Sequence, residues 1–243
     1  MHPDTMRLID RWVGIPLCFF ASFWPLKKAQ ADSNSTLATN IPPPDTIVFI
    51  GIAEIGALVV AYPAIKETRK QHPKSRICFI TAPAGLQTLE LMGFEKEDIF
   101  LLETSSIKSL LKGIVNIRSH FKGKRVSAIV LEPFTRFSTL LSAWIGASKR
   151  IGCYRFLNEG VYLGNILTHR LVYNPHLHIS QTYFALAKAL IEKDSAKPLL
   201  KEYIPSQIKN PHKINIPEKE QQTLMKRLQS ECPENPLKEI FHA

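Results

Sequence analysis

The chain has 243 residues, 45% of them hydrophobic, and this is the composition of a soluble globular protein that can bury a core in one large domain. Its formal net charge of +10 predicts an anionic partner: nucleic acid, an anionic membrane surface, or a phosphorylated or acidic substrate. Because the basic residues are spread along the chain and no DNA- or RNA-reading motif occurs, the sequence argues against nucleic acid as the main partner.

The four cysteines are widely separated, with neither a Cys-x-x-Cys pair nor the spacing of metal ligands. They are Cys18, Cys78, Cys153 and Cys232. We therefore expect a reducing compartment, no disulfide and no metal site. Cys78 lies within an apolar strand pattern, which indicates a small core residue.

Residues 1–31 form an apolar and basic N-terminal segment, in which the run from Trp12 to Leu26 has two arginines before it and two lysines after it. Aromatic residues with basic flanks favour an anchor that lies at a membrane interface. Two other interpretations stay open: a packed N-terminal helix, and a signal peptide or membrane-spanning segment, with Ala29-Gln30-Ala31 as a cleavage site. Prolines and aromatic residues within the run argue against the last. Residues 32–45, rich in Ser, Asn, Thr and Pro, predict a linker.

The stretch from Thr46 to Lys66 predicts a strand, a turn and a helix. The strand Ile47–Ile52 is almost wholly apolar, which is typical of a strand covered on both faces. The turn contains Glu54 and Gly56, and from Ile55 onwards apolar residues recur at helical spacing. A glycine in such a turn lets the backbone approach a ligand, and a helix N-terminus attracts anions. The alternative is an ordinary first unit of a parallel sheet.

Further strands and helices alternate along the chain. We expect strands at Arg76–Thr81, Asp98–Leu102, Val126–Leu131 and Arg150–Cys153, and helices at Ala84–Met92, Ser105–Phe121, Phe137–Ile145 and His178–Ile191. Residues 154–175 show no regular period, and beyond residue 194 we expect one weak helix at 217–229. This alternation predicts an α/β domain at residues 46–194, with a Rossmann-like, right-handed parallel sheet and flanking helices.

No catalytic triad, P-loop, metal set or GxGxxG motif occurs, so the sequence predicts no cofactor. The candidates for chemistry are polar residues at the carboxyl ends of the predicted strands, where open α/β sheets bind ligands. Glu54 is placed to act as a general base, or is a solvated acid favoured by the helix dipole. Glu132 and Arg136, after the fourth strand, could bind substrate or form a structural salt bridge.

Basic residues bracket the strand predicted at Arg150–Cys153. Lys149, Arg150 and Arg155 could bind phosphate or carboxylate groups of a substrate, and the alternative is a solvated basic edge. His178 stands where a helical period resumes, and we interpret it as a helix start or a core residue.

Several segments resemble, in order, the motifs of one family. FIGIAEIGALVVAYPAIK is similar to an N-terminal strand, Lys-x-x-x-x-Gly-Asp and a helix with a Pro-Ala-Leu-like step, in which Gly56 and Pro63-Ala64-Ile65 match. SAIVLEPFTRFSTLLSAWIGASKRIGCYR and LTHRLVYNPHLHISQTYFALAKAL are similar to the later segments, and IDRWVGIPLCF to an N-terminal extension found in a subgroup. The family is that of the family 9 glycosyltransferases, the lipopolysaccharide heptosyltransferases and their relatives, and the resemblance covers most of residues 6–200.

The resemblance implies the GT-B architecture, in which an N-terminal Rossmann-like domain binds a lipid-linked or growing glycan acceptor. A C-terminal domain would bind the nucleotide sugar, usually ADP-heptose. Transfer would be metal-independent and inverting: a base deprotonates the acceptor hydroxyl, and positive groups stabilise the leaving diphosphate. Two residues depart from the motif, since Gly51 and Ala57 stand where the family has Lys and the catalytic Asp. Glu54 is the nearest carboxylate that could replace that Asp.

The expected function is therefore transfer of a sugar from a nucleotide sugar to a lipopolysaccharide or exopolysaccharide acceptor, in the cytoplasm and peripherally at the inner membrane. This chain would supply the acceptor-binding half, with residues 195–243 as an inter-domain segment and the donor domain absent. The expected site has Glu54 as catalytic base and a set of substrate-binding residues: Gly56, Glu132, Arg136, Arg150 and Arg155. The alternative, which the missing motif Asp favours, is a non-catalytic glycan- or partner-binding module.

Overall fold

The structure is a computed structural model and describes residues 12–23, 43–52, 55–156, 161–191, 195–199 and 218–231. The chain divides into two compact units, at residues 1–211 and 212–243. In the second unit the described part is one helix, α8 (Glu218–Glu231), close to the weak helix that the sequence predicts.

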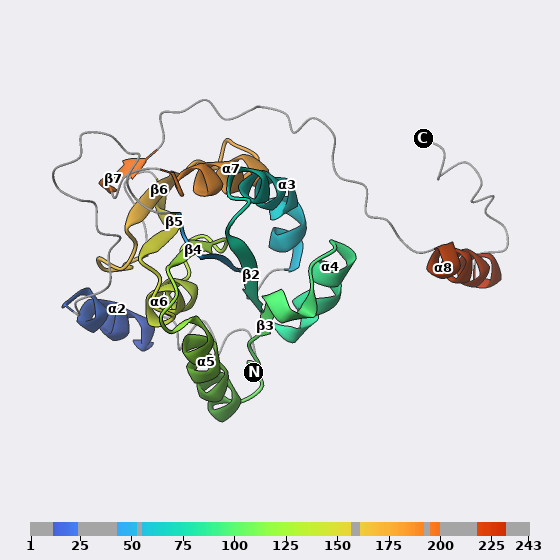
Figure 1. Cartoon of the computed structure of the whole chain (residues 1–243), viewed down its shortest axis with the longest axis horizontal. Helices are drawn as coiled ribbons and strands as arrows, with labels where there is room; N and C mark the ends of the chain where they lie inside the picture. The colour runs from blue at the N-terminus through green and yellow to red at the C-terminus, as the bar shows by residue number, and fades with distance from the viewer. Residues whose placement is uncertain are drawn as a thin grey trace. The chain divides into compact units, whose positions relative to one another are not determined.

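The first unit is built on a seven-stranded sheet in which every neighbouring pair of strands is parallel (Figure 1). The order across the sheet is β3-β2-β1-β4-β5-β6-β7. The strands are β1 (Thr46–Ile50), β2 (Arg76–Thr81), β3 (Ile99–Leu101), β4 (Val126–Val130), β5 (Lys149–Phe156), β6 (His169–Tyr173) and β7 (Ser195–Leu199). The predicted α/β class with a Rossmann-like parallel sheet is confirmed.

Helices cover both faces of this sheet. Figure 1 shows α3 and α7 on one face, α2, α5 and α6 on the other, and α4 beside β3 at the edge. Their bounds are α2 (Gly14–Phe23), α3 (Ile55–Gln71), α4 (Leu86–Leu91, after a 3-10 turn at Pro83–Gly85), α5 (Ile107–Phe121), α6 (Arg136–Trp144) and α7 (Ile179–Lys188). A second 3-10 turn, Lys96–Asp98, precedes β3.

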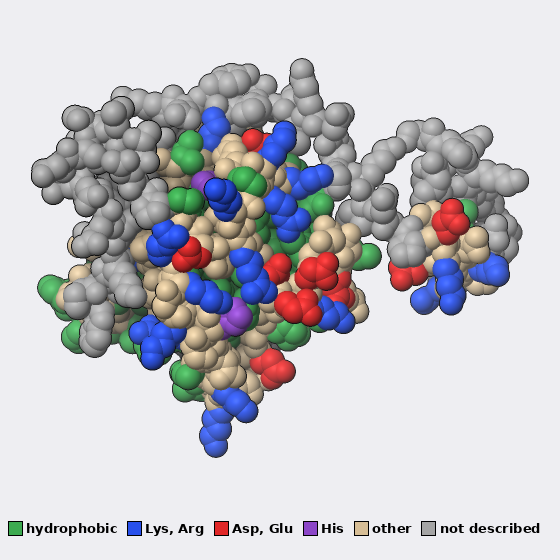
Figure 2. Space-filling view, viewed as in Figure 1, with side chains coloured by type: hydrophobic (Ala, Val, Ile, Leu, Met, Phe, Trp, Pro, Cys, Tyr) green, Lys and Arg blue, Asp and Glu red, His purple; other side chains and the backbone are tan. Residues whose placement is uncertain are grey.

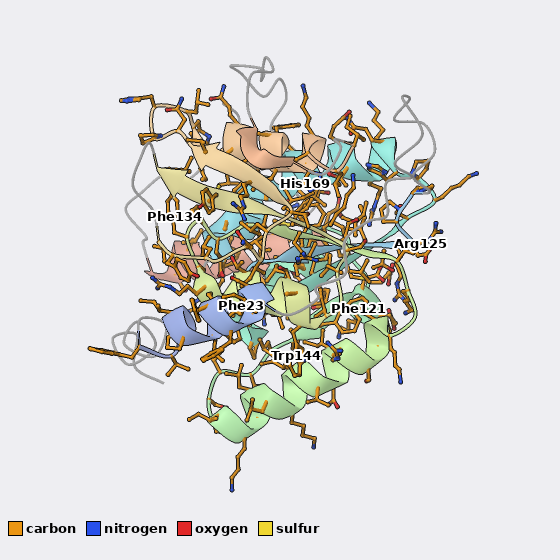
Figure 3. The ribbon with its side chains drawn as sticks, turned by 90° about the vertical axis from the view of Figure 1, so that its left-hand side faces the viewer. Phe23, Phe121, Arg125, Phe134, Trp144 and His169 are labelled. Carbon is orange, nitrogen blue, oxygen red and sulfur yellow. The ribbon has the colours of Figure 1, made fainter. Side chains whose placement is uncertain are left out.

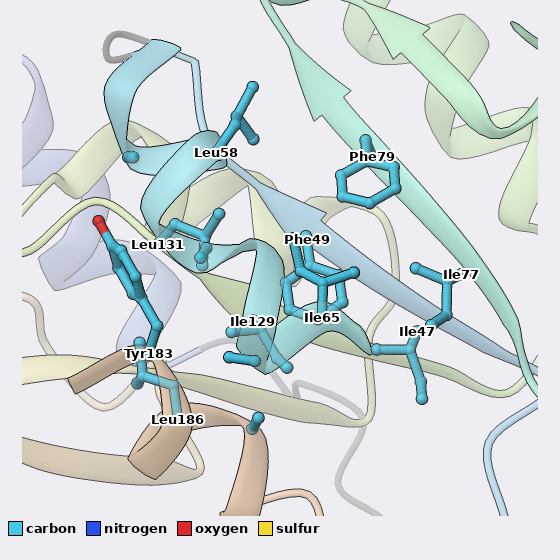
Figure 4. Packing of buried hydrophobic residues seen from close by; sticks show 14 of the residues in the cluster. Ile47, Phe49, Leu58, Ile65, Ile77, Phe79, Ile129, Leu131, Tyr183 and Leu186 are labelled. Carbon is cyan, nitrogen blue, oxygen red and sulfur yellow. The ribbon is translucent and has the colours of Figure 1, made fainter. Parts of the chain in front are cut away.

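Strand alternation divides the core into two layers. On β1, Ile47 and Phe49 belong to the cluster that packs against α3 and α7, where Phe49 stacks on Phe79 with ring centroids 5.7 Å apart (Figure 4). Val48 and Ile50 belong to the cluster on the opposite face, with side chains of α5 and α6. Because successive side chains of a strand point to opposite faces, a strand buried on both is mostly apolar, and in β1 only Thr46, at its start, is polar.

Two strands were not expected from the sequence. β6 lies inside the region 154–175 that the sequence leaves irregular, and β7 extends the sheet beyond residue 194. The connection between β5 and β6 has no helix in its described part, residues 161–168, so the expected strand–helix alternation is broken there. β7 contains Pro198, which lacks an amide donor and is tolerated because β7 lies at the edge.

The apolar residues of helix α5 are divided between buried and exposed positions. Ile117 and Phe121 are buried against the sheet, and Leu110 and Ile114 pack at its margin. Ile107 and Leu111, which are also apolar, are exposed.

Helix α2 comes from the apolar N-terminal segment and contacts α6. Its Cys18 is fully buried, and the Ser22 hydroxyl accepts a hydrogen bond from the amide of Asn165 at 2.9 Å. The described residues of this segment therefore form a packed helix, one of the open interpretations. Among the described helices none is long and apolar enough to cross a membrane.

Candidate functional site

The topology places a ligand-binding edge between β1 and β4. From β1 the chain runs through α3 on one face to β2, and from β4 through α6 on the other face to β5. Open α/β sheets bind ligands outside the carboxyl ends of strands at such a switch point. In Figure 3, Arg125, which precedes β4, and Phe134, which follows it, lie at opposite sides of the view. The candidate site is at the Phe134 end.

Glu132 ties the two strands together at this edge. The side chain is buried, and its Oε1 accepts a hydrogen bond at 2.7 Å from the amide of Ile52, 80 residues earlier in the chain. The other oxygen, Oε2, accepts from the hydroxyl of Ser138 in the first turns of α6. One carboxylate thus holds the end of β1, the end of β4 and α6 in a fixed arrangement, and it fixes the backbone just before residues 53–54.

The first turn of α3 is open to solvent at Gly56. A Cβ built at Gly56 would meet nothing within 4 Å, so neither packing nor a positive φ requires glycine there. Absence of a side chain leaves the first amides of α3 accessible, as anion binding at a helix N-terminus needs. Ala57, at the place of the family's catalytic Asp, is buried. Glu54, the predicted base, lies outside the described residues.

The turn after β4 holds its shape under backbone strain. Phe134 has a φ of 62°, in the left-handed region that residues with a Cβ rarely occupy. Its ring packs edge-on against Tyr173 at the end of β6, with centroids 5.7 Å apart. Strained residues persist where packing over-determines them, and they concentrate at binding and catalytic sites. This strain is a further reason to take the edge as the candidate site.

Two predicted basic residues lie at this edge. Arg136, half-buried at the start of α6, donates from Nε to the carbonyl of Tyr162 at 3.1 Å and so joins α6 to the β5–β6 connection. The backbone of Arg155 lies near the carboxyl end of β5, opposite Val172 of β6. Its strand position is at the candidate edge.

Arg150 does not lie at this edge. It pairs with Ala128 in the middle of β4, and only 1% of its surface is exposed. Its guanidinium donates to the carbonyls of Ile166, at 2.6 Å, and Ala147. Neighbouring Lys149, also buried, donates to the carbonyl of Leu190 at 2.9 Å. We therefore assign both residues to the framework, where they hold the elements around β5, in place of the predicted contact with substrate.

His178 is the N-cap of α7, as predicted for a helix start. Its Nδ1 accepts from the amide of Ser180 at 3.3 Å, which satisfies one of the donors that a helix leaves unpaired at its N-terminus. The described residues contain no group of three His, Cys, Asp or Glu side chains arranged to hold a metal ion.

Much of the positive charge lies away from the candidate edge. Lys and Arg side chains are spread over the face seen in Figure 2, which looks on the amino ends of the strands. Basic residues occupy the last turns of α3 (Arg69, Lys70), α5 (Arg118) and α7 (Lys188), where they complement the helix dipole. Part of the net charge thus has a structural origin.

The edge therefore offers a solvent-open helix turn and a strained turn, braced by a buried carboxylate. Such an arrangement can hold hydroxyl and phosphate groups of a polar ligand in a fixed position. The sequence indicates Glu132 and Arg136 but misses Ser138 and Phe134. Ser138 could have been found, because it is a serine that follows the acidic residue at the end of a predicted strand. The positive φ of Phe134 leaves no trace in the sequence.

The sheet order, with helices on both faces, defines a Rossmann-like α/β fold with a switch point between β1 and β4. The structure is similar to that of a glycosyltransferase family 9 protein from Veillonella parvula DSM 2008, with a TM-score of 0.52 and 16% sequence identity, over 79% of this chain and 51% of that chain. This similarity confirms the family 9 resemblance at the level of the fold.

Weaker similarities are to two proteins of E. coli. ADP-heptose lps heptosyltransferase II matches with a TM-score of 0.49 and 18% identity, over 75% of this chain and 50% of that chain. Heptosyltransferase WaaC with ADP-2-deoxy-2-fluoro heptose matches with a TM-score of 0.47 and 10% identity, over 63% and 50%. The chain spans about half the length of the solved structures it matches. No protein-family model matches it, and no curated protein is similar to it in sequence.

Proposed function

We propose that this chain forms the acceptor-binding half of a glycosyltransferase of the family 9 type. The observation that carries the proposal is the fold shared with the V. parvula protein over 79% of this chain. The ordered sequence motifs and the strained, open edge at the β1–β4 switch point support it. The reaction is transfer of a sugar from a nucleotide sugar to a lipopolysaccharide or exopolysaccharide acceptor, on the cytoplasmic side of the inner membrane.

In this proposal the acceptor glycan lies along the carboxyl edge, over the first turn of α3. Glu54 accepts the proton of the attacking hydroxyl, and its neighbour Ile52 is held in place by Glu132. Arg136 and Arg155 bind phosphate or carboxylate groups of the acceptor. Transfer is metal-independent and inverts the anomeric centre, and the nucleotide sugar binds to a C-terminal domain of the GT-B fold, which also stabilises the leaving diphosphate.

Calorimetry with two ligand classes tests whether this chain binds the acceptor and not the donor. The 243-residue chain is titrated with deacylated lipopolysaccharide oligosaccharides as acceptor and with ADP-heptose as donor. We expect heat of binding from the acceptor only, and an Arg136→Gln variant should weaken it. Sub-micromolar binding of ADP-heptose to this chain would contradict the half-enzyme proposal. Once the chain is combined with a donor domain, an unchanged transfer rate in Glu54→Gln would exclude Glu54 as the base.

A second candidate function is a non-catalytic module that binds a glycan or a partner chain. The observation that favours it is Ala57, which stands at the motif Asp position and is buried. The module predicts acceptor binding as above but no transfer when a donor domain is supplied. The enzyme predicts transfer that falls when Glu54 is changed to Gln.

A further inference from the structure

Helix α2 exposes large apolar side chains along most of its length. Trp12, just before the helix, is 73% exposed, and Phe20 and Phe23 on the helix are 69% and 72% exposed. Only Gly14 and Cys18 are buried among the residues of the helix. Hydrophobic side chains are visible where α2 lies, at the lower left of Figure 2. Isolated exposed apolar residues are ordinary, but a group of aromatic ones indicates a contact surface.

This surface continues through α6 to α5. Leu111 and Val115 of α5, 57% and 56% exposed, share one helix face with Arg118, because residues three, four and seven positions apart lie on the same side. Arg118 donates to the carbonyl of Trp144 in α6, and its guanidinium lies 5.1 Å from the centroid of the Trp144 ring. Arg118 thus links this face of α5 to α6, and α6 in turn contacts α2. Figure 3 shows α2 and α5 on either side of Trp144.

We define the apolar flank as the exposed side chains of Trp12, Phe20, Phe23, Leu111, Val115 and Trp144. It lies over the outer face of one helix layer. The candidate active edge, at the carboxyl ends of the strands, is a different surface.

Of the three helices beneath the flank, α5 and α6 carry basic residues, and none of the three carries an acidic one. No Asp or Glu occurs in the sequences of α2, α5 or α6. Lys108 and Lys112 are exposed on α5, next to its apolar stripe. Helices elsewhere in the unit do contain acids, such as Glu67 in α3 and Glu90 in α4. Within these helices, aromatic side chains therefore occur together with positive charge only, while the exposed Glu103 stands before α5.

We propose that the apolar flank is the surface by which this protein lies on an anionic lipid bilayer. Aromatic rings enter the headgroup region, while the long stems of Lys108 and Lys112 let their ammonium groups reach lipid phosphates. A second copy of the chain fits less well, because the helices of the flank have no carboxylates to pair with these lysines and protein interfaces are poor in lysine. This inference rests on the proposed function and deepens it, since it names the surface that faces the membrane.

Vesicle co-sedimentation of the full 243-residue chain tests the proposal. Vesicles of phosphatidylcholine with phosphatidylglycerol should bind the chain, and vesicles of phosphatidylcholine alone should bind it more weakly. The double variant Phe20→Ser with Phe23→Ser should lower the affinity for the mixed vesicles by about tenfold or more. An Ile191→Ser variant is the matched control, since Ile191 is 62% exposed and lies just after α7 in the other helix layer.

The charge contribution has its own pair of variants. Lys108→Gln with Lys112→Gln should lower the affinity for mixed vesicles by about tenfold and leave binding to phosphatidylcholine unchanged. Lys70→Gln with Lys74→Gln removes the same charge near the end of α3 and should have a much smaller effect. The vesicles contain no glycolipid acceptor, so vesicle binding is tested independently of acceptor binding. Failure of the proposed acceptor binding would not count against the membrane surface, and failure of vesicle binding would not count against acceptor binding.

Two results would overturn the proposal. One is equal loss of vesicle binding in flank and control variants, or no binding to mixed vesicles. The other is a lipid-free dimer, seen by sedimentation equilibrium, that Phe20→Ser with Phe23→Ser dissociates, because the flank would then join two copies of the chain. Variants that unfold are recognised by their circular dichroism. In place of such variants, a chain in which Trp144 is the only tryptophan tests the same surface. Brominated lipids should quench its fluorescence if the flank lies on the bilayer.

Discussion

Gly164 is the residue on which the docking of α2 depends most directly. Its φ is +59°, and a Cβ at this position would lie 2.6 Å from the carbonyl oxygen of Cys18 and would also collide with the hydroxyl of Ser22. Both of these residues belong to α2. A Gly164→Ala substitution should therefore push α2 away from the β5–β6 connection.

Gly123 offers a matched control. Its φ is +82°, but a Cβ there would meet nothing within 4 Å. A left-handed backbone conformation costs about 1–2 kcal/mol for a residue with a Cβ, so both substitutions should lower the free energy of unfolding by this much. Gly164→Ala should lower the free energy of unfolding by about 1–3 kcal/mol more, which is the usual cost of overpacking.

The assay is urea denaturation of both variants, with hydrogen exchange of the α2 amides as the second readout. We expect Gly164→Ala to have the lower midpoint and to lose protection in α2, including the amides near Ser22. Gly123→Ala should keep that protection. Equal midpoints, or unchanged exchange in α2 of Gly164→Ala, would refute the packing of α2 described above.

Three further predictions concern buried and half-buried polar groups. Glu132→Ala should destabilise the fold by about 2–4 kcal/mol in urea denaturation, because two buried donors lose their acceptor, whereas Glu132→Gln should cost less; equal losses would contradict the bracing role. Burial, and then the charge of Lys149, lower the pKa of His72 from its ordinary 6.5. Its contribution to stability is therefore present above that value and lost as pH falls below it, so His72→Gln should reduce the loss of urea midpoint on acidification; an unchanged pH profile would exclude this. Burial raises the pKa of Cys78 and of Cys153 to about 12, so both thiols should resist iodoacetamide at mildly alkaline pH until the chain is unfolded, as peptide mass spectrometry can establish.

Periodicity was enough to predict the centre of the sheet. β1 and β4 are buried on both faces and hence almost wholly apolar, with Thr46 and Ser127 as the polar exceptions, and such a pattern clearly indicates a strand. β6 and β7 lie towards the edge, where fewer side chains need be apolar. The short stretch His169–Tyr173 contains two basic or ionisable residues, and Ser195–Leu199 contains a proline. Such strands form because a neighbour provides a backbone partner, which local sequence does not encode.

The candidate site was predictable where chain topology alone determines position. Glu132 follows β4, so a parallel sheet places it at the carboxyl edge. Its bond to Ile52 depends on β1 and β4 being neighbours, which the sequence order of the strands does not reveal. Arg150 shows the converse: a basic residue beside a strand suggested a ligand contact, yet its guanidinium is enclosed and bonded to carbonyl oxygens.

The central claim is that the carboxyl edge between β1 and β4 binds a glycan acceptor. Hydrogen exchange of the chain, with and without deacylated lipopolysaccharide oligosaccharides, tests it most directly. We expect the oligosaccharide to protect amides at residues 51–58 and 132–138 and to leave exchange in α8 unchanged. Protection confined to the amino ends of the strands, or none at saturating oligosaccharide, would contradict it.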